Sequence, residues 1–155
     1  MKNLHLCLMI SVLAGCATSR DAATFATAPM PEVKPDKAIL YIFRHYAEPT
    51  AFASYLEIDK QEVASLNQEG FTWVYVEPGT HNFEFGWPFF ASMPSVKFQH
   101  TLQAGETYAF EMQGSSSYSG NQFNTRSAIQ PIKIEEAIAR MNICCRYVAP
   151  VKPAK

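Results

Sequence analysis

Short apolar runs, separated by turn residues roughly every 8–12 positions, dominate the chain from Ala38 onward. In several runs apolar and polar residues alternate, so that Phe83, Phe85 and Trp87, for example, fall on one face of an extended segment. Such runs predict an antiparallel β-sandwich rather than βαβ units, with about seven or eight short strands. The expected strands cover residues 38–45, 52–58, 62–66, 71–76, 81–87, 96–102, 108–113 and 127–132.

Three positions have the chemistry of tight turns. In Glu77-Pro78-Gly79-Thr80, Pro78 presets φ at the second turn position and Gly79 accepts a positive φ at the third, which is the type II pattern. This predicts a hairpin formed by the strands on either side. Asp59-Lys60 lies where a second hairpin would turn, although lysine suits a positive φ less well than glycine. Gly105 is the third turn residue.

The C-terminal stretch has the period of a helix. One apolar stripe at i, i+3, i+4 and i+7 is formed by Ile134, Ala137, Ile138 and Met141. Glu135 and Glu136 lie at the start of this segment, where the helix dipole favours acidic side chains. We expect a short helix on the sandwich or its edge, and residues 144–148 are a candidate last strand. The folded domain is therefore predicted to span residues 38–148, with a C-terminal tail at 149–155.

The first residues have the composition of a signal peptide. A basic start precedes roughly 11 mostly apolar residues, 4–14, whereas a membrane-spanning helix needs about 20. The segment Leu13-Ala14-Gly15-Cys16 resembles the lipobox of bacterial lipoproteins. The resemblance implies that residues 1–15 are removed and that Cys16 carries a diacylglycerol and an amide-linked acyl chain such as palmitate. An ordinary secretory signal and a core cysteine are the alternatives.

An acylated Cys16 would keep the protein on a membrane, because each buried methylene contributes about 0.8 kcal/mol. In lipoproteins of bacteria with two membranes, Asp directly after the lipidated cysteine retains the chain at the inner membrane. Ala17 stands there in this chain, which implies the outer membrane, facing the periplasm. Residues 16–37 are rich in Ala, Thr, Ser and Pro, and they predict a lipid-anchored tether of about 25 Å.

The charge of the chain excludes one class of partner. The 155 residues have a formal net charge of −1 at pH 7, and loss of Lys2 with the signal peptide makes the chain one unit more negative. A nucleic-acid-binding protein needs a basic stripe, so we expect no nucleic-acid partner. The expected partners are the membrane, through the lipid, and an envelope protein or cell-wall component.

Four segments resemble, in their order, a family of small bacterial lipoproteins that carry a sandwich-like domain of unknown function. These are Ala38-Ile-Leu-Tyr-Ile-Phe-Arg44, Leu56-Glu-Ile-Asp59, Tyr75-Val-Glu-Pro-Gly-Thr-His81 and Leu102-Gln-Ala-Gly-Glu-Thr-Tyr108. The resemblance covers about Lys37 to Val148. The chain departs from it at Lys60, where the family turns on glycine, and in a polar loop expected at 114–126. The resemblance implies an envelope protein and assigns no catalytic residue.

Three histidines, His45, His81 and His100, follow the signal peptide. His81 follows a turn and has Glu77 and Glu84 near it in sequence, so an acid–base or metal site is one interpretation. The sequence has no His-x-x-x-His pair and no Gly-x-Ser-x-Gly elbow. We therefore expect His81 to be a strand-start residue and His100 a core residue. No catalytic residue, metal ligand or cofactor is predicted.

Adjacent cysteines at 144 and 145 leave three alternatives open. One or both thiols of Cys144 and Cys145 are buried beside the helix, the two form a vicinal disulfide, or one is bonded to another chain. The chain has no Cys-x-x-Cys pair, which disfavours oxidoreductase chemistry.

The segment Trp87-Pro-Phe-Phe-Ala-Ser-Met-Pro94 breaks the strand pattern with prolines and leaves large apolar side chains in a loop. An exposed apolar loop indicates a partner or lipid contact, and its candidate residues are Trp87, Phe89, Phe90 and Met93. Alternatively, the loop folds back over the open end of the sandwich. The sequence thus favours a lipid-anchored, non-enzymatic envelope binding or accessory module. The alternative is a small envelope hydrolase or metal-binding protein that uses His81 and nearby acids.

Overall fold

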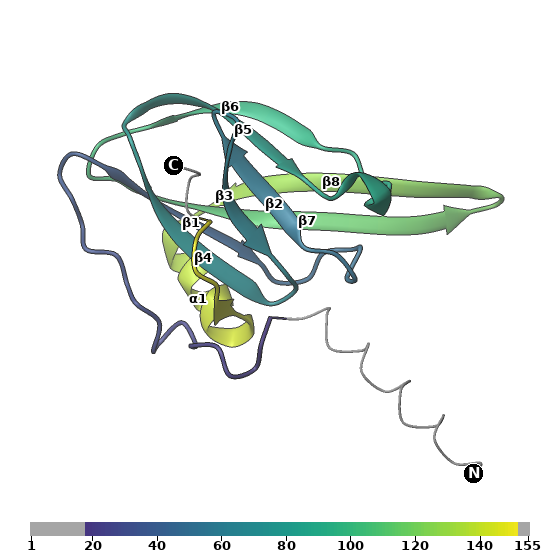
Figure 1. Ribbon diagram of the computed structural model, residues 1–155, viewed down its shortest axis with the longest axis horizontal. Helices are drawn as coiled ribbons and strands as arrows, with labels where there is room; N and C mark the ends of the chain where they lie inside the picture. The colour runs from purple at the N-terminus through teal and green to yellow at the C-terminus, as the bar shows by residue number, and fades with distance from the viewer. Residues whose placement is uncertain (1–17, 152–155) are drawn as a thin grey trace, which may run out of the picture.

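The computed structural model describes residues 18–151, and this part of the chain folds mainly as β-strands with one short C-terminal helix (Figure 1). One sheet has the order β8-β7-β1-β4-β9 and the other the order β3-β2-β5-β6. The predicted mainly β fold is confirmed. The elements are β1 (Ala38–Arg44), β2 (Ser54–Ile58), β3 (Gln61–Leu66), β4 (Gly70–Val76), β5 (Gly79–Gly86), the 3-10 turn η1 (Phe89–Ala91), β6 (Val96–Leu102), β7 (Thr107–Ser119), β8 (Gln122–Ile132), α1 (Ile134–Cys144) and β9 (Arg146–Tyr147).

Most neighbouring strands are antiparallel, but β1 pairs with β7, and β4 with β9, in parallel. Parallel neighbours need a long crossover connection, and here β2–β6 separate β1 from β7 along the chain. The predicted antiparallel sandwich therefore contains two parallel strand pairs as well.

Strand β1 is central and buried along its whole length. Leu40 and Ile42 face the core between the two sheets, while Tyr41 and Phe43 face a second core on the outer side of the first sheet. This explains why Ala38–Phe43 is a continuous apolar run without polar alternation, as expected for a strand covered on both faces.

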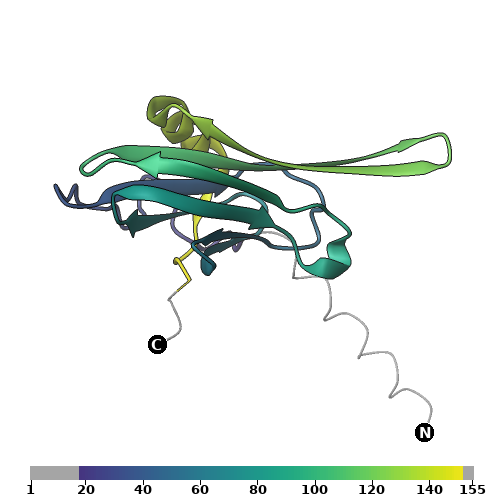
Figure 2. The ribbon, with the colours of Figure 1, turned by 90° about the horizontal axis from the view of Figure 1, so that it is seen from above.

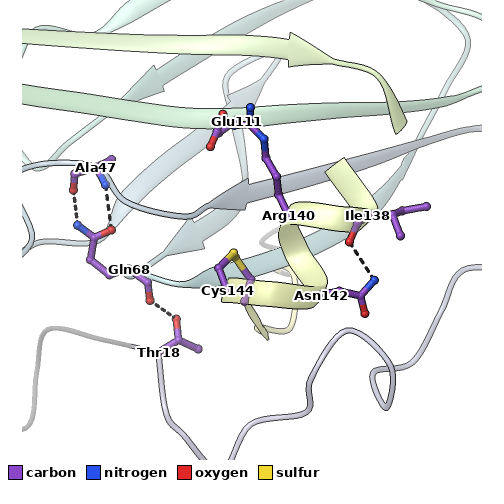
Figure 3. Close-up of a disulfide and its surroundings, with 9 residues drawn as sticks. Thr18, Ala47, Gln68, Glu111, Ile138, Arg140, Asn142 and Cys144 are labelled. Carbon is purple, nitrogen blue, oxygen red and sulfur yellow. Dashed lines mark hydrogen bonds and ion pairs between the residues drawn. A yellow bond between two sulfur atoms is a disulfide. The ribbon is translucent and has the colours of Figure 1, made fainter. Parts of the chain in front are cut away.

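Helix α1 covers part of that outer side. Its buried residues are Ala137 and Met141, both members of the predicted apolar stripe. Arg140 extends this contact, because its guanidinium lies 2.7 Å from the buried carboxylate of Glu111 on β7 (Figure 3). The predicted helix is confirmed.

The prediction of a tether is wrong for residues 18–37, which we call the N-terminal strap. Phe25 is buried, and its ring centre lies 5.3 Å from that of Phe71. The indole of Trp73 donates to the Pro29 carbonyl oxygen at 2.7 Å, and the Tyr75 hydroxyl donates to that of Glu32 at 2.7 Å. The strap is held by β4 side chains that lie far from it in sequence, so local composition gave no sign of the contact.

The Glu77–Thr80 segment does not form the predicted hairpin, because β4 and β5 belong to different sheets. It is instead the crossover between them. Gly79 has a positive φ as predicted, but the value of 139° is far from the roughly +80° of a type II turn. The same proline-glycine chemistry therefore serves a change of sheet here.

Replacing Gly79 by valine is expected to lower the free energy of unfolding by about 1–3 kcal/mol, since a β-branched residue resists this backbone conformation. A Cβ at this position would meet only the His81 ring at 3.9 Å, so the effect comes from the backbone and not from a clash. Urea denaturation measures it, with Thr80→Val as the matched control. Equal stability of the Gly79 variant and wild type would contradict this account.

The Asp59-Lys60 hairpin is confirmed. It joins β2 to β3, and both central residues have positive φ, 50° and 68°. Gly105 also has a positive φ, 76°, in the turn between β6 and β7.

The segment predicted as a polar loop at 114–126 is instead the outer part of a long hairpin. Strands β7 and β8 stay paired from Ala109 and Ile132 to Ser119 and Gln122. Figures 1 and 2 show this hairpin projecting well beyond the rest of the molecule. Serine-rich sequence has little apolar alternation, which is why the strand pattern faded there.

Candidate binding surface

One end of the sandwich contains the end of β1 and the beginnings of β2, β4 and β6, and the β7–β8 hairpin projects from it (Figure 1). We call it the aromatic end, because it exposes the rings of Tyr46, Phe89, Phe90, Tyr118 and Phe123. The candidate surface is built on this end.

Arg44 organises the interior of the aromatic end. Its guanidinium is fully buried and donates hydrogen bonds of 2.7–2.9 Å to four backbone carbonyl oxygens, and it stacks 4.5 Å from the Trp87 ring. Burial lowers the pKa of Arg44 to about 10, so the group stays charged at neutral pH. The carbonyls belong to Ala47, Pro49, Phe52 and Leu66. These bonds hold the loop at 45–53 in place around the Arg44 side chain.

Gln68 ties this loop to the N-terminal strap. Its side-chain amide accepts a hydrogen bond from the Ala47 N–H at 3.0 Å and donates one to the Ala47 carbonyl oxygen. The carbonyl oxygen of Gln68 accepts bonds from the Thr18 N–H at 3.1 Å and the Thr18 hydroxyl at 2.9 Å (Figure 3). The first described residue is therefore fixed at the aromatic end.

The loop at 87–94, which the sequence offered as a candidate contact surface, has a buried and an exposed part. Trp87 is buried and its indole donates to the Ser127 hydroxyl at 3.0 Å, so the prediction that it is exposed in the loop is wrong. Met93 is half-buried against the core between the sheets. Phe89 and Phe90 remain exposed, at 94% and 59% of their surface. Stacking on the distant Arg44 explains the burial of Trp87.

The exposed rings form a knob on the 3-10 turn η1. Phe89 and Phe90 lie 5.3 Å apart between ring centres, and Phe90 lies 5.2 Å from Phe52. The Thr125 hydroxyl of β8 donates to the Ser92 carbonyl oxygen at 3.3 Å, which links the knob to the hairpin. We call this feature the Phe89–Phe90 knob.

The hairpin tip carries the second pair of exposed rings. Tyr118 and Phe123 are cross-strand neighbours, 6.0 Å apart between ring centres and exposed at 74% and 58%. Closer to the body, Glu48 accepts hydrogen bonds from the N–H and the hydroxyl of Ser116, which lower the pKa of its carboxyl group. A Cβ at Gly114 would lie 2.0 Å from the Glu48 carbonyl oxygen, so only glycine allows the loop to cross the hairpin there.

His81 lies at the opposite end of the sandwich. Its Nδ1 lies 2.6 Å from the Asp59 carboxylate and its Nε2 2.8 Å from the Glu77 carbonyl oxygen, and both acceptors favour a doubly protonated ring. The hydrogen bond to Asp59 is the main cause of a raised His81 pKa. Asp59 was not predicted as the partner of His81, because the pairing of β2 with β5, which brings the two residues together, leaves no signal in the local sequence.

The two acids considered with His81 are engaged elsewhere. The Glu77 carboxylate pairs with Lys37, and that of Glu84 lies 3.0 Å from the ammonium group of Lys97. His100 is half-buried, with its ring 5.5 Å from those of Tyr108 and Phe110. In residues 18–151 no three His, Cys, Asp or Glu side chains are grouped so that they could hold a metal ion.

The raised pKa of His81 makes stability depend on pH. The protonated ring is favoured in the folded state, so its contribution is fully present below the unfolded pKa of about 6.5 and is lost as pH rises through the folded value. We expect NMR titration of the ring to give a pKa above 6.5, and Asp59→Asn to lower it. A midpoint unchanged by Asp59→Asn would contradict the pairing.

Cys144 and Cys145 are joined in the structure as a vicinal disulfide at the end of α1 (Figure 3). Of the three alternatives this is the arrangement that the structure contains, and Cys145 is also buried against the outer core. Cys16, the predicted lipid-attachment residue, lies outside the described residues.

None of the helices within residues 18–151 is long and apolar enough to span a membrane. No protein-family model matches the chain, and no curated protein matches it. The likeness to the family of sandwich-domain lipoproteins therefore stays a prediction from the quoted segments.

Proposed function

We propose that the protein is a lipid-anchored, non-enzymatic binding module of the bacterial cell envelope, held at the outer membrane by acylated Cys16 and facing the periplasm. In this proposal the β7–β8 hairpin contacts another envelope protein. The observation that carries the proposal is the projection of this hairpin beyond the sandwich with two exposed aromatic rings at its tip.

The hairpin has the properties of a recognition element. Its outer residues, from Ser115 to Arg126, are mostly exposed and add little to either core. A two-stranded ribbon without a covering layer is marginal on its own, and here Glu48 and Thr125 brace it near the body. Exposed strand edges pair readily with another chain, and aromatic residues dominate the binding energy of many interfaces.

A cleft of about 260 Å³ lies beside the base of the hairpin and extends this surface. Its lining includes Tyr46, Gln113 and Arg126, which offer an aromatic ring, an amide and a positive charge. A partner strand or loop that follows the hairpin toward the body would meet these groups. The cleft is therefore suited to a segment of a partner protein that carries polar groups.

The alternative function, a hydrolase or metal-binding protein that uses His81, has less support. Both ring nitrogens of His81 already have acceptors, and Glu77 and Glu84 are paired with lysines. A general base or a metal ligand needs a neutral ring with an available nitrogen. Loss of function on replacing His81 by alanine in a folded protein would favour the alternative again.

Site-specific photo-crosslinking in intact cells tests the proposed function. A benzophenone amino acid in place of Phe123 is expected to give a discrete crosslinked protein, and the same group in place of exposed Gln103, in the β6–β7 turn, is not. With the crosslinker at Ser117, Tyr118→Ser together with Phe123→Ser should remove the product. Identical patterns at the two ends, or none at Phe123 in a correctly anchored protein, would contradict the proposal.

A further inference from the structure

We infer that the Phe89–Phe90 knob rests in the lipid leaflet that holds Cys16, so that the domain lies on the membrane with the side opposite α1 down and the β7–β8 hairpin running along the surface. This inference rests on the proposed lipid anchor and goes further by naming what covers the most exposed apolar side chain of the sandwich. In this orientation the tip of the β7–β8 hairpin remains accessible to the proposed protein partner.

The anchor cannot be far from the domain. Thr18 is fixed by two hydrogen bonds to Gln68, and Cys16 precedes it by two residues. Two residues span at most about 7 Å, so the lipid-bearing cysteine stays close to the aromatic end. From Thr18 the strap runs back over the outer face of the first sheet and does not lengthen the anchor. The bilayer surface is therefore near Gln68.

The knob lies at the same end of the sandwich as the anchor point. Contacts run without interruption from Gln68 through Ala47 to Arg44, and Arg44 binds the Phe52 carbonyl oxygen. The ring of Phe52 in turn contacts Phe90. Figure 2 shows η1 and the start of the described chain on one side of the molecule and α1 on the other. One surface can therefore touch both.

The distribution of charged and aromatic side chains fits this orientation. The opposite end carries the charged pairs Lys37–Glu77 and His81–Asp59, which belong in water. The knob carries two phenylalanine rings, with Phe89 almost completely exposed, and phenylalanine is among the residues that membrane-surface helices bury at the boundary between headgroups and acyl chains. Because the anchor already holds the knob at the surface, the insertion step is intramolecular, and two rings suffice where a free protein would need more.

A fluorescent label reports whether the knob enters lipid. The acylated full-length protein is reconstituted in vesicles of phosphatidylethanolamine and phosphatidylglycerol, with an environment-sensitive nitrobenzoxadiazole group on a cysteine introduced by Phe89→Cys. The exposure of Phe89 means that the label should not disturb folding. The matched control is the same label on Gln103→Cys. We expect a blue shift of the emission and quenching by brominated lipids at 89, and neither at 103.

Each outcome decides a different claim. If intact mass shows no acyl chains on the native protein, the proposed anchor is wrong and the inference falls with it. If the acyl chains are present but the label at 89 behaves like the one at 103, the anchor stands and the inference is wrong. If the label at 89 is shielded only after solubilised envelope proteins are added, the knob binds a protein and not lipid.

Discussion

Replacing Arg44 by methionine is expected to lower the free energy of unfolding by about 3–5 kcal/mol. Methionine fills much of the volume but donates no hydrogen bond, so the four carbonyl oxygens around the guanidinium lose their donor in a buried site. The stacking partner of Trp87 is lost as well. Urea denaturation followed by circular dichroism measures the change.

Lysine at the same position is the informative control. It keeps the positive charge but lacks the planar fork that reaches several carbonyls at once, so Arg44→Lys should fall between wild type and Arg44→Met. Wild-type stability of the methionine variant would mean that water satisfies the carbonyls equally well. The loop at 45–53 would then not depend on Arg44.

Replacing Phe25 by alanine is expected to cost about 3–5 kcal/mol, because it removes a buried ring from the outer core. The ring lies between Phe71 and Tyr41, with centres 5.3 and 6.2 Å away. Its loss should also release the strap, so trypsin should cleave after Arg20 faster than in wild type. Denaturation and limited proteolysis measure the two effects.

Met30→Ala is the matched control within the strap. Met30 is substantially exposed, so its truncation should change stability by less than about 0.5 kcal/mol. If Phe25→Ala left both stability and cleavage rate unchanged, the strap would not be part of the folded domain, and the earlier prediction of a free tether would stand.

Local sequence was enough to predict the elements of the body. The period-two runs located the strands, and the stripe from Ile134 to Met141 located the helix, because both patterns reflect one buried face. Local sequence was not enough where a residue is buried by a contact with a residue far away in the chain. Burial of Trp87 depends on Arg44, and docking of Phe25 depends on Phe71, and neither contact leaves a trace in the neighbouring residues.

Turn residues likewise predicted where the chain turns but not which strands pair on either side of the turn. Asp59-Lys60 joins strands of one sheet and Gly79 joins strands of two sheets, although both positions need a positive φ. Which strands pair across a turn depends on the other neighbours of each strand. At the candidate surface, Phe89 and Phe90 were found because a break in the alternation exposes them. Tyr118 and Phe123 were missed because they lie in a serine-rich segment.

The strap closes against the last strand of the domain, and this sets an order of events during synthesis. Thr24 bridges to Arg146, and the Tyr147 N–H donates to the Ala23 carbonyl oxygen at 2.8 Å. The residues made first can take their final position only after those made almost last have emerged. Under the proposed function, Cys16 therefore stays within reach of the processing and acylating enzymes until the chain is nearly complete, and docking of the strap then draws the finished domain down to its lipid.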